Sequence, residues 1–223
     1  MSAKTIVFLF LVALATSHAQ APAGPCCYPD QFVIAYGSQS GISHFGTAAA
    51  IGIFANSAFD FTNKMIGEEG TLVVEGQPPK DYKVIQDYAQ GVQYTIDRGE
   101  SKCDKTKLAG PMQHCVPGGA IFNATAYLGD KKLNIDSYYY VILTPQQQGR
   151  LALSVTQGDC LPNSYSFTGK AGPTSILTVT GYFNYVQGIA DPSAFFDVPD
   201  YCPSYITAES ELLKQLKYQR VQY

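Results

Sequence analysis

Apolar and polar residues alternate through the stretch from Tyr82 to Cys103. Within it Val92, Tyr94 and Ile96 are apolar, whereas Gln93, Thr95 and Asp97 between them are polar. Successive side chains of a β-strand point to opposite faces, so this period of two predicts a strand with one buried and one wetted face. Ala89-Gln90-Gly91 separates it from a preceding run, and glycine tolerates the positive φ that hairpin turns often need. The stretch is therefore predicted to be a β-hairpin.

Strand-like runs of the same kind cover most of the chain. Beyond the hairpin we predict strands at residues 31–36, 47–54, 58–65, 71–75, 120–128, 133–144, 151–157, 165–168 and 176–186. A polar loop is expected at 37–46, and a long connection restrained by Cys115 at 103–119. Charged residues make up only 15% of the chain, against a typical quarter, and aromatic residues are plentiful. This composition favours sheets.

Two of the predicted strands are apolar or aromatic on both faces. They are 135–143, with the sequence IDSYYYVIL, and 176–186, where Leu177, Val179, Phe183 and Tyr185 share one face. A strand with two apolar faces is covered on one side and meets a second layer or a cavity on the other. The pattern therefore predicts two layers of structure.

The C-terminal segment is the one clear helix in the pattern. Thr207 is expected to cap it, acidic residues come early and basic residues late, and Leu212, Leu213 and Leu216 form an apolar stripe. A narrow stripe of this kind favours a helix that packs on a sheet over one that binds a partner. A shorter helical turn is expected at 191–195.

Residues 1–19 have the features of a secretory signal peptide: a basic start at Lys4, an apolar run, and small residues at Ser17 and Ala19. The run is shorter than the ~20 apolar residues that a membrane span needs. We therefore predict an exported protein without a transmembrane anchor, whose mature chain is a single domain over 20–223.

The six cysteines are Cys26, Cys27, Cys103, Cys115, Cys160 and Cys202, and all follow the predicted signal. An even number in an exported chain indicates disulfide bonds. Cys26 and Cys27 point in different directions on an extended chain, so each is expected to bond a different distant segment. Six cysteines permit fifteen pairings, and spacing alone selects none of them.

The sequence contains no recognised catalytic, phosphate-binding or metal-binding motif, so we predict a protein that is not an enzyme and has no cofactor. The histidines His44 and His114 are better explained as a solvated loop residue and the neighbour of a disulfide. A net charge of -3 without basic clusters argues against nucleic acid as a partner. Asn123-Ala124-Thr125 is the one glycosylation sequon.

Several short segments occur in an order that resembles the ependymin family. The first set is Tyr94-Thr-Ile-Asp97, Cys103-Asp-Lys-Thr-Lys-Leu108, Pro111, Val116-Pro117, the sequon, and Tyr127-Leu-Gly129. The second runs from Tyr182 through Asp191-Pro-Ser-Ala-Phe195 to Val198-Pro199 and Cys202. Together they span most of the mature chain, and Leu177 to Cys202 is the most specific part.

The resemblance implies a secreted glycoprotein with a fold similar to the bacterial lipoprotein carriers. In such a fold a strongly curved antiparallel sheet, or two stacked sheets, encloses an apolar pocket with helices alongside. The resemblance also implies calcium binding, contacts with extracellular matrix and a homodimer. It pairs Cys103 with Cys202 and one of Cys26 or Cys27 with Cys160, which leaves the other for Cys115.

Two functions follow as hypotheses. One is a carrier that binds an apolar ligand, such as a fatty acid or another lipid, with a pocket wall of Tyr94, Ile96, Tyr139, Val141, Phe183 and Tyr185. The other is a structural or adhesion protein of an extracellular or mineralised matrix, without a ligand pocket. The sequence does not separate a filled core from a hollow one, because both need the same apolar residues.

Overall fold

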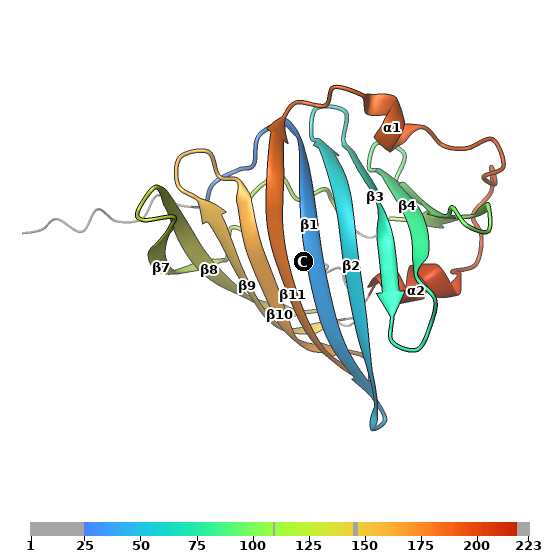
Figure 1. Cartoon of the computed structure of the whole chain (residues 1–223), viewed down its shortest axis with the longest axis horizontal. Coiled ribbons are helices and arrows are strands. Elements are labelled where there is room, and N and C mark those ends of the chain that lie inside the picture. The colour runs from blue at the N-terminus through green and yellow to red at the C-terminus, as the bar shows by residue number, and fades with distance from the viewer. Residues whose placement is uncertain (1–24, 109, 145–146, 218–223) are drawn as a thin grey trace, which may run out of the picture.

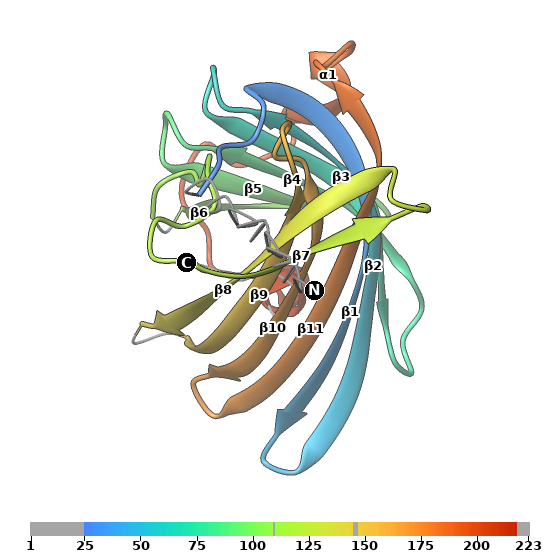
Figure 2. The same cartoon turned by 90° about the vertical axis from the view of Figure 1, so that its left-hand side faces the viewer.

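The computed structural model describes residues 25–108, 110–144 and 147–217. The predicted signal peptide at 1–19 lies outside the described residues. Eleven strands form a single antiparallel sheet in the order β6-β5-β4-β3-β2-β1-β11-β10-β9-β8-β7. The sheet is long and strongly curved (Figures 1 and 2). The expected mainly β fold with a curved antiparallel sheet is confirmed, in its single-sheet form.

The chain builds this sheet in two halves that meet at its centre. The first half runs outward from the central strand to one edge through β1 (Gln31–His44), β2 (Thr47–Asp60), β3 (Met65–Val74), β4 (Lys80–Asp87), β5 (Val92–Asp97) and β6 (Lys102–Lys107). The second half returns from the other edge through β7 (Ile121–Leu128), β8 (Leu133–Leu143), β9 (Gln148–Thr156), β10 (Pro162–Ala171) and β11 (Thr174–Gln187). Pairing of β1 with β11 joins the halves.

The predicted hairpin is confirmed as β4 and β5, joined by a turn in which Gly91 has a φ of 69°. The Asp87 carboxylate accepts hydrogen bonds from the backbone N–H and the side-chain amide of Gln90, at 2.9 and 2.6 Å. These bonds satisfy turn donors that would otherwise need water. The turn therefore forms where the sequence predicted it.

Several predicted boundaries were wrong because short polar residues occupy inward-facing strand positions. The expected loop at 37–46 is mostly a continuation of β1. There Ser38 and Ser40 are buried, and their hydroxyls bond those of Thr180 and Thr178 on β11 at 2.8 and 2.5 Å. Likewise β2 is one strand where two were expected, and β6 lies inside the expected connection.

The C-terminal helix, α2 (Glu211–Lys217), packs its apolar stripe into the core as expected. Leu212, Leu213 and Leu216 are buried, and two of them join the cluster around Tyr82 and Val84. The helix begins later than predicted, because the Ser210 hydroxyl, and not Thr207, accepts a hydrogen bond from the N–H of Leu213. Thr207 bonds the backbone of Lys105 on β6 instead.

The short helix α1 (Pro192–Phe196) lies against the opposite face of the sheet, beside β3 (Figure 1). Asp191 caps it by accepting hydrogen bonds from the N–H groups of Ser193 and Ala194. A Cβ atom at Gly67 of β3 would come within 2.7 Å of Phe195, so only glycine allows this close approach. Among the described residues, no helix is long and apolar enough to cross a membrane.

Candidate ligand-binding hollow

A hollow of about 490 Å³ lies on the concave face of the sheet. It is lined by both halves of the sheet, by α2 and by the connection between β6 and β7 that crosses this face. The described lining residues are Tyr28, Phe32, Phe59, Ile66, Glu68, Gln86, Tyr88, Gln93, Thr106, Lys107, Leu108, Pro111, Gln113, Pro162, Tyr165, Tyr182, Glu209, Leu213, Leu216 and Lys217. Its volume falls within the ~300–1,000 Å³ typical of small-molecule sites.

Aromatic rings form one wall of the hollow. Phe32 of β1 stacks on Phe59 of β2 with ring centroids 4.8 Å apart, and Tyr165 of β10 meets Tyr182 of β11 at 6.2 Å. The first two residues share a face because antiparallel pairing places Phe32 opposite Phe59. Side chains at such paired positions point the same way. The wall is therefore a direct product of strand register.

Polar groups interrupt the apolar lining on strands β3 to β5. The side-chain amide of Gln86 donates to the amide oxygen of Gln93 at 2.7 Å, and Gln93 donates to the Thr95 hydroxyl at 3.1 Å. The buried Tyr82 hydroxyl donates to the Glu68 carboxylate at 2.6 Å. An apolar site with a small number of oriented polar groups is the usual composition of a ligand pocket.

The predicted pocket wall was wrong for five of its six residues, which lie on the convex face. Tyr94 and Ile96 alternate with the inward-facing Gln93 and Thr95, so they point away from the hollow. Lys105 on the neighbouring strand β6 lies 5.3 Å from the centre of the Tyr94 ring. The side chains expected to be wetted, Gln93 and Thr95, are buried.

On the second half of the sheet, too, most of the residues expected to face the hollow face the convex side. Tyr139 and Val141 alternate with the buried Tyr138 and Ile142, and Arg150 lies 4.4 Å from the centre of the Tyr139 ring. Phe183 faces the convex side beside Phe54, with ring centroids 5.5 Å apart. Tyr185 alone packs beside the hollow, 5.6 Å from the wall residue Phe32. It follows an irregularity at Asn184, whose φ is 53°.

Sequence reasoning missed the residues that line the hollow, notably Gln86, Gln93, Tyr165 and Tyr182. A signal for Gln93 exists, since polar residues recur at every second position of β5 where a solvated face was expected. That signal becomes informative only when the concave side is known. The alternation of apolar and polar residues shows which side chains share a face of the sheet. It does not show which of the two faces is concave.

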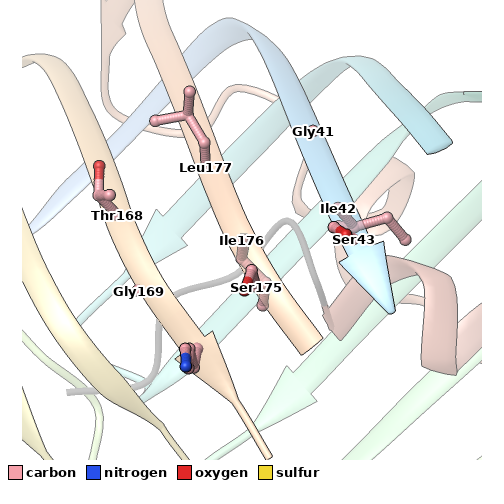
Figure 3. Close-up of a pocket in the computed structure, with 9 residues that line it drawn as sticks. Gly41, Ile42, Ser43, Thr168, Gly169, Ser175, Ile176 and Leu177 are labelled. Carbon is pink, nitrogen blue, oxygen red and sulfur yellow. The ribbon is translucent and has the colours of Figure 1, made fainter. Parts of the chain in front are cut away.

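A second depression, of about 450 Å³, lies on the convex face near the ends of β1, β10 and β11 (Figure 3). Most of its described lining residues are small, among them Gly41, Ser43, Gly169 and Ser175. Lys170 is the one charged residue among them. A surface of this composition offers little to hold a ligand, so we assign the candidate site to the concave hollow.

Three disulfide bonds join distant segments of the chain around the hollow. They join Cys26 to Cys160, Cys27 to Cys115 and Cys103 to Cys202. The resemblance implies this pairing except for the choice between Cys26 and Cys27, which the structure decides. The bond from Cys27 fastens the connection between β6 and β7 to the N-terminal segment. Backbone hydrogen bonds from Tyr28 to His114 and from Val116 to Cys26 reinforce that junction, each at 2.9 Å.

Tyr28 lines the hollow next to this junction, and burial raises the pKa of its phenol to about 12. In the unfolded chain the phenol has a pKa of ~10, so unfolded molecules lose the proton first as the pH rises. The protonated phenol of Tyr28 therefore stabilises the folded protein. This contribution is fully present below pH ~10 and is lost between pH ~10 and ~12.

We therefore expect the wild-type protein to lose about 2–3 kcal/mol more unfolding free energy than Tyr28→Phe between pH ~9 and ~12. Urea titrations of both proteins across this range measure the difference. Burial also raises the pKa values of Tyr138 and Tyr185, but both remain in the variant, so the comparison isolates Tyr28. Parallel pH profiles for the two proteins would show that folding does not change the proton affinity of the Tyr28 phenol.

The remaining predicted site residues lie apart from the hollow. Asn123 is exposed on β7. The His44 ring bonds the Thr174 hydroxyl at 2.8 Å, and the His114 ring bonds the backbone oxygen of Tyr28 at 2.8 Å. Across the part of the chain that the structure describes, no group of three or more His, Cys, Asp or Glu residues is placed to hold a metal ion.

Comparison with known proteins gives the chain clear relatives. A family model described as Ependymin matches residues 77–202. The development-specific protein LVN1.2 of Lytechinus variegatus is 35% identical over 162 residues, which cover 67% of this chain and 86% of that protein. The ependymin-related protein 1 of Haliotis asinina is 28% identical, over 79% of this chain and 90% of that protein.

Solved structures give a likeness of fold without similarity of sequence. An uncharacterized conserved protein from Thermus thermophilus matches 77% of this chain and 86% of its own, with a TM-score of 0.51 and 6% identity. A LolA superfamily protein from Nitrosomonas europaea matches 77% of this chain and 91% of its own, with a TM-score of 0.31 and 10% identity. At that score a specific likeness to the lipoprotein carriers stays a prediction.

Proposed function

The chain belongs to the ependymin family, and from that premise we propose that it is a binding protein that holds one long apolar chain, such as a fatty acid, in its concave hollow. The observation that carries the proposal is the composition of the hollow. Aromatic and aliphatic side chains converge there from both halves of the sheet, while the polar groups come from strands β3 to β6, from the connection after β6 and from the α2 region. Burial of apolar ligand surface against such walls contributes ~25 cal/mol per Å².

The polar groups give the proposed ligand a direction. Glu209 and Lys217 of the α2 region lie at the hollow and are bonded to each other, and Lys107 of β6 is an exposed residue of the same lining. A ligand with a polar head places that head near these charged residues and its apolar tail against Phe32 and Phe59. This arrangement keeps the head hydrated and avoids the cost of burying it.

Binding without catalysis fits the arrangement of the side chains. A nucleophile needs a base within hydrogen-bonding reach. The two described histidines bond a threonine hydroxyl and a backbone carbonyl, and neither is among the residues that line the hollow. We therefore propose a carrier and not an enzyme.

Native mass spectrometry of protein purified from its own source, before and after organic extraction, tests this function. We expect one lipid per chain that leaves on extraction, and one-to-one rebinding of the fluorescent fatty acid cis-parinaric acid. A chain that is empty as purified and also fails to bind cis-parinaric acid would overturn the proposal. That result is the one expected of the alternative, a matrix protein without a ligand.

Export, calcium binding, matrix contacts and homodimer formation stay predictions from the sequence. Calcium needs several oxygen ligands gathered together. Two acidic groups of the described chain already have internal partners: Asp136 accepts bonds from Thr125 and Gln157, and Asp191 caps α1. Calorimetric titration with calcium measures the first property, and the mass of the protein in solution measures its oligomeric state.

A further inference from the structure

The two edges of the open sheet are β6 and β7, and they differ sharply. An edge strand carries backbone N–H and C=O groups that no neighbouring strand pairs, so it is a template for pairing with another chain. Proteins protect such edges with charged residues, bulges or covering segments.

The β6 edge has two kinds of protection. Its sequence, KCDKTK, contains three lysines and an aspartate. The segment before α2 also lies along it, because the N–H of Lys105 donates to the Thr207 hydroxyl at 3.1 Å and the N–H of Thr207 donates to the Lys105 carbonyl at 2.8 Å. The Cys103–Cys202 bond fixes that segment in place. Lateral pairing of β6 with another strand is therefore blocked.

Within the described chain the β7 edge has no charged residue and no covering segment, and its one protective feature is a bulge at Asn123. Its sequence, IFNATAYL, contains no charged residue and no proline, and every residue except Phe122 is exposed. Ile121, Tyr127 and Leu128 have exposed fractions of 53%, 55% and 45%. An uncharged strand with aromatic and β-branched residues is the composition that pairs most readily with another strand.

Asn123 lies at the one irregular position of this strand. The register of β7 against β8 shifts between Phe122 and Ala124, so Asn123 is the extra, unpaired residue of a bulge. Its neighbour Phe122 packs inward on Tyr138, with ring centroids 5.8 Å apart, and anchors the strand at this point. Asn123 itself is exposed and begins the sequon Asn123-Ala124-Thr125.

We propose that Asn123 carries an N-linked glycan and that this glycan protects the β7 edge from pairing with a second strand. A glycan is bulky and strongly hydrated, so it supplies on β7 the protection that lysines and a covering segment supply on β6. Without it, β7 pairs with β7 of a second copy, because antiparallel pairing of two identical strands satisfies a two-fold axis.

The test compares the exported glycoprotein, made in eukaryotic cells, with Asn123→Gln. Mass spectrometry of the glycoprotein is expected to find carbohydrate on Asn123. In sedimentation, we expect the weight-average mass of Asn123→Gln to rise with concentration and to approach about twice the mass of the glycoprotein, as a closed β7–β7 pair requires. The amides of β7 should exchange hydrogen more slowly as the protein associates.

Two further variants distinguish protection of the β7 edge from a general effect of carbohydrate on association. Asn123→Gln with Ala124→Lys returns a charge to the exposed edge strand and should restore the mass of the glycoprotein. Asn123→Gln with Val186→Thr makes a new sequon at the exposed Asn184 on β11, away from the edge, and should still associate. An unmodified Asn123, an Asn123→Gln variant that does not associate, or a glycan on Asn184 that prevents association would each contradict the proposal.

Discussion

Replacement of Ile66 by tryptophan is expected to weaken binding of cis-parinaric acid at least about tenfold, which corresponds to ~1.4 kcal/mol. Ile66 lies on β3, opposite Gln86 of β4, and lines the hollow. The indole ring adds volume at a place where the ligand and the wall would otherwise be in contact. Fluorescence titration of the probe measures the change.

Val73→Trp is the matched control for this variant. Val73 lies on the same strand but on its convex face, where 46% of its surface is exposed. The same indole ring there should leave probe affinity within about twofold of wild type, because surface substitutions away from a site have small effects. Thermal unfolding of both variants separates loss of binding from loss of structure. A folded Ile66→Trp protein that binds like wild type would place the ligand elsewhere.

Removal of the Cys103–Cys202 bond is expected to lower the unfolding free energy by about 3 kcal/mol. The bond closes a loop with a sequence separation of 99 residues. For a loop of that length, restriction of the unfolded chain alone contributes ~4.7 kcal/mol. The other two bonds already restrict the unfolded chain, so the expected loss is smaller.

The double variant Cys103→Ala with Cys202→Ala tests this without leaving a free thiol. Urea titration gives the stability, and hydrogen exchange should show faster opening of β6, because the segment from Cys202 to Thr207 is no longer fixed along it. The double variant Cys27→Ala with Cys115→Ala serves as the comparison. Loss of the Cys27–Cys115 bond should instead speed hydrogen exchange at the amides of Tyr28 and Val116. A loss below about 1 kcal/mol would show that noncovalent contacts hold the C-terminal segment by themselves.

Local patterns predicted much of the secondary structure because the physics behind them is local. The β4–β5 hairpin depends on Gly91 and on the Asp87 side chain, both within a few residues of the turn. The stripe of Leu212, Leu213 and Leu216 depends only on helical spacing. By contrast, Ser38 and Ser40 resemble loop residues until their hydroxyls meet Thr178 and Thr180, more than a hundred residues away.

The candidate site was not predictable in the same way. The six expected wall residues were chosen as apolar members of alternating strands, and five of them face outward. Gln93 and Thr95, which look like solvated residues, are buried beside the hollow because β5 lies on the arm of the sheet that faces α2. Hydrophobicity located most of the strands, but it gave the wrong face for five of the six expected wall residues.

The sequence by itself determined the period-two strands, the hairpin turn at Gly91, the apolar stripe of the last helix and, through its likeness to ependymins, the disulfide partners apart from the choice between Cys26 and Cys27. Only the tertiary structure decided that one continuous sheet bends around α2, that Phe32, Phe59, Tyr165 and Tyr182 become its inner wall, and that β7 is left as a bare edge. The physical reason is that alternation fixes which side chains share a face. The direction of curvature, and the segments that cover each face, depend on contacts between residues far apart in the chain.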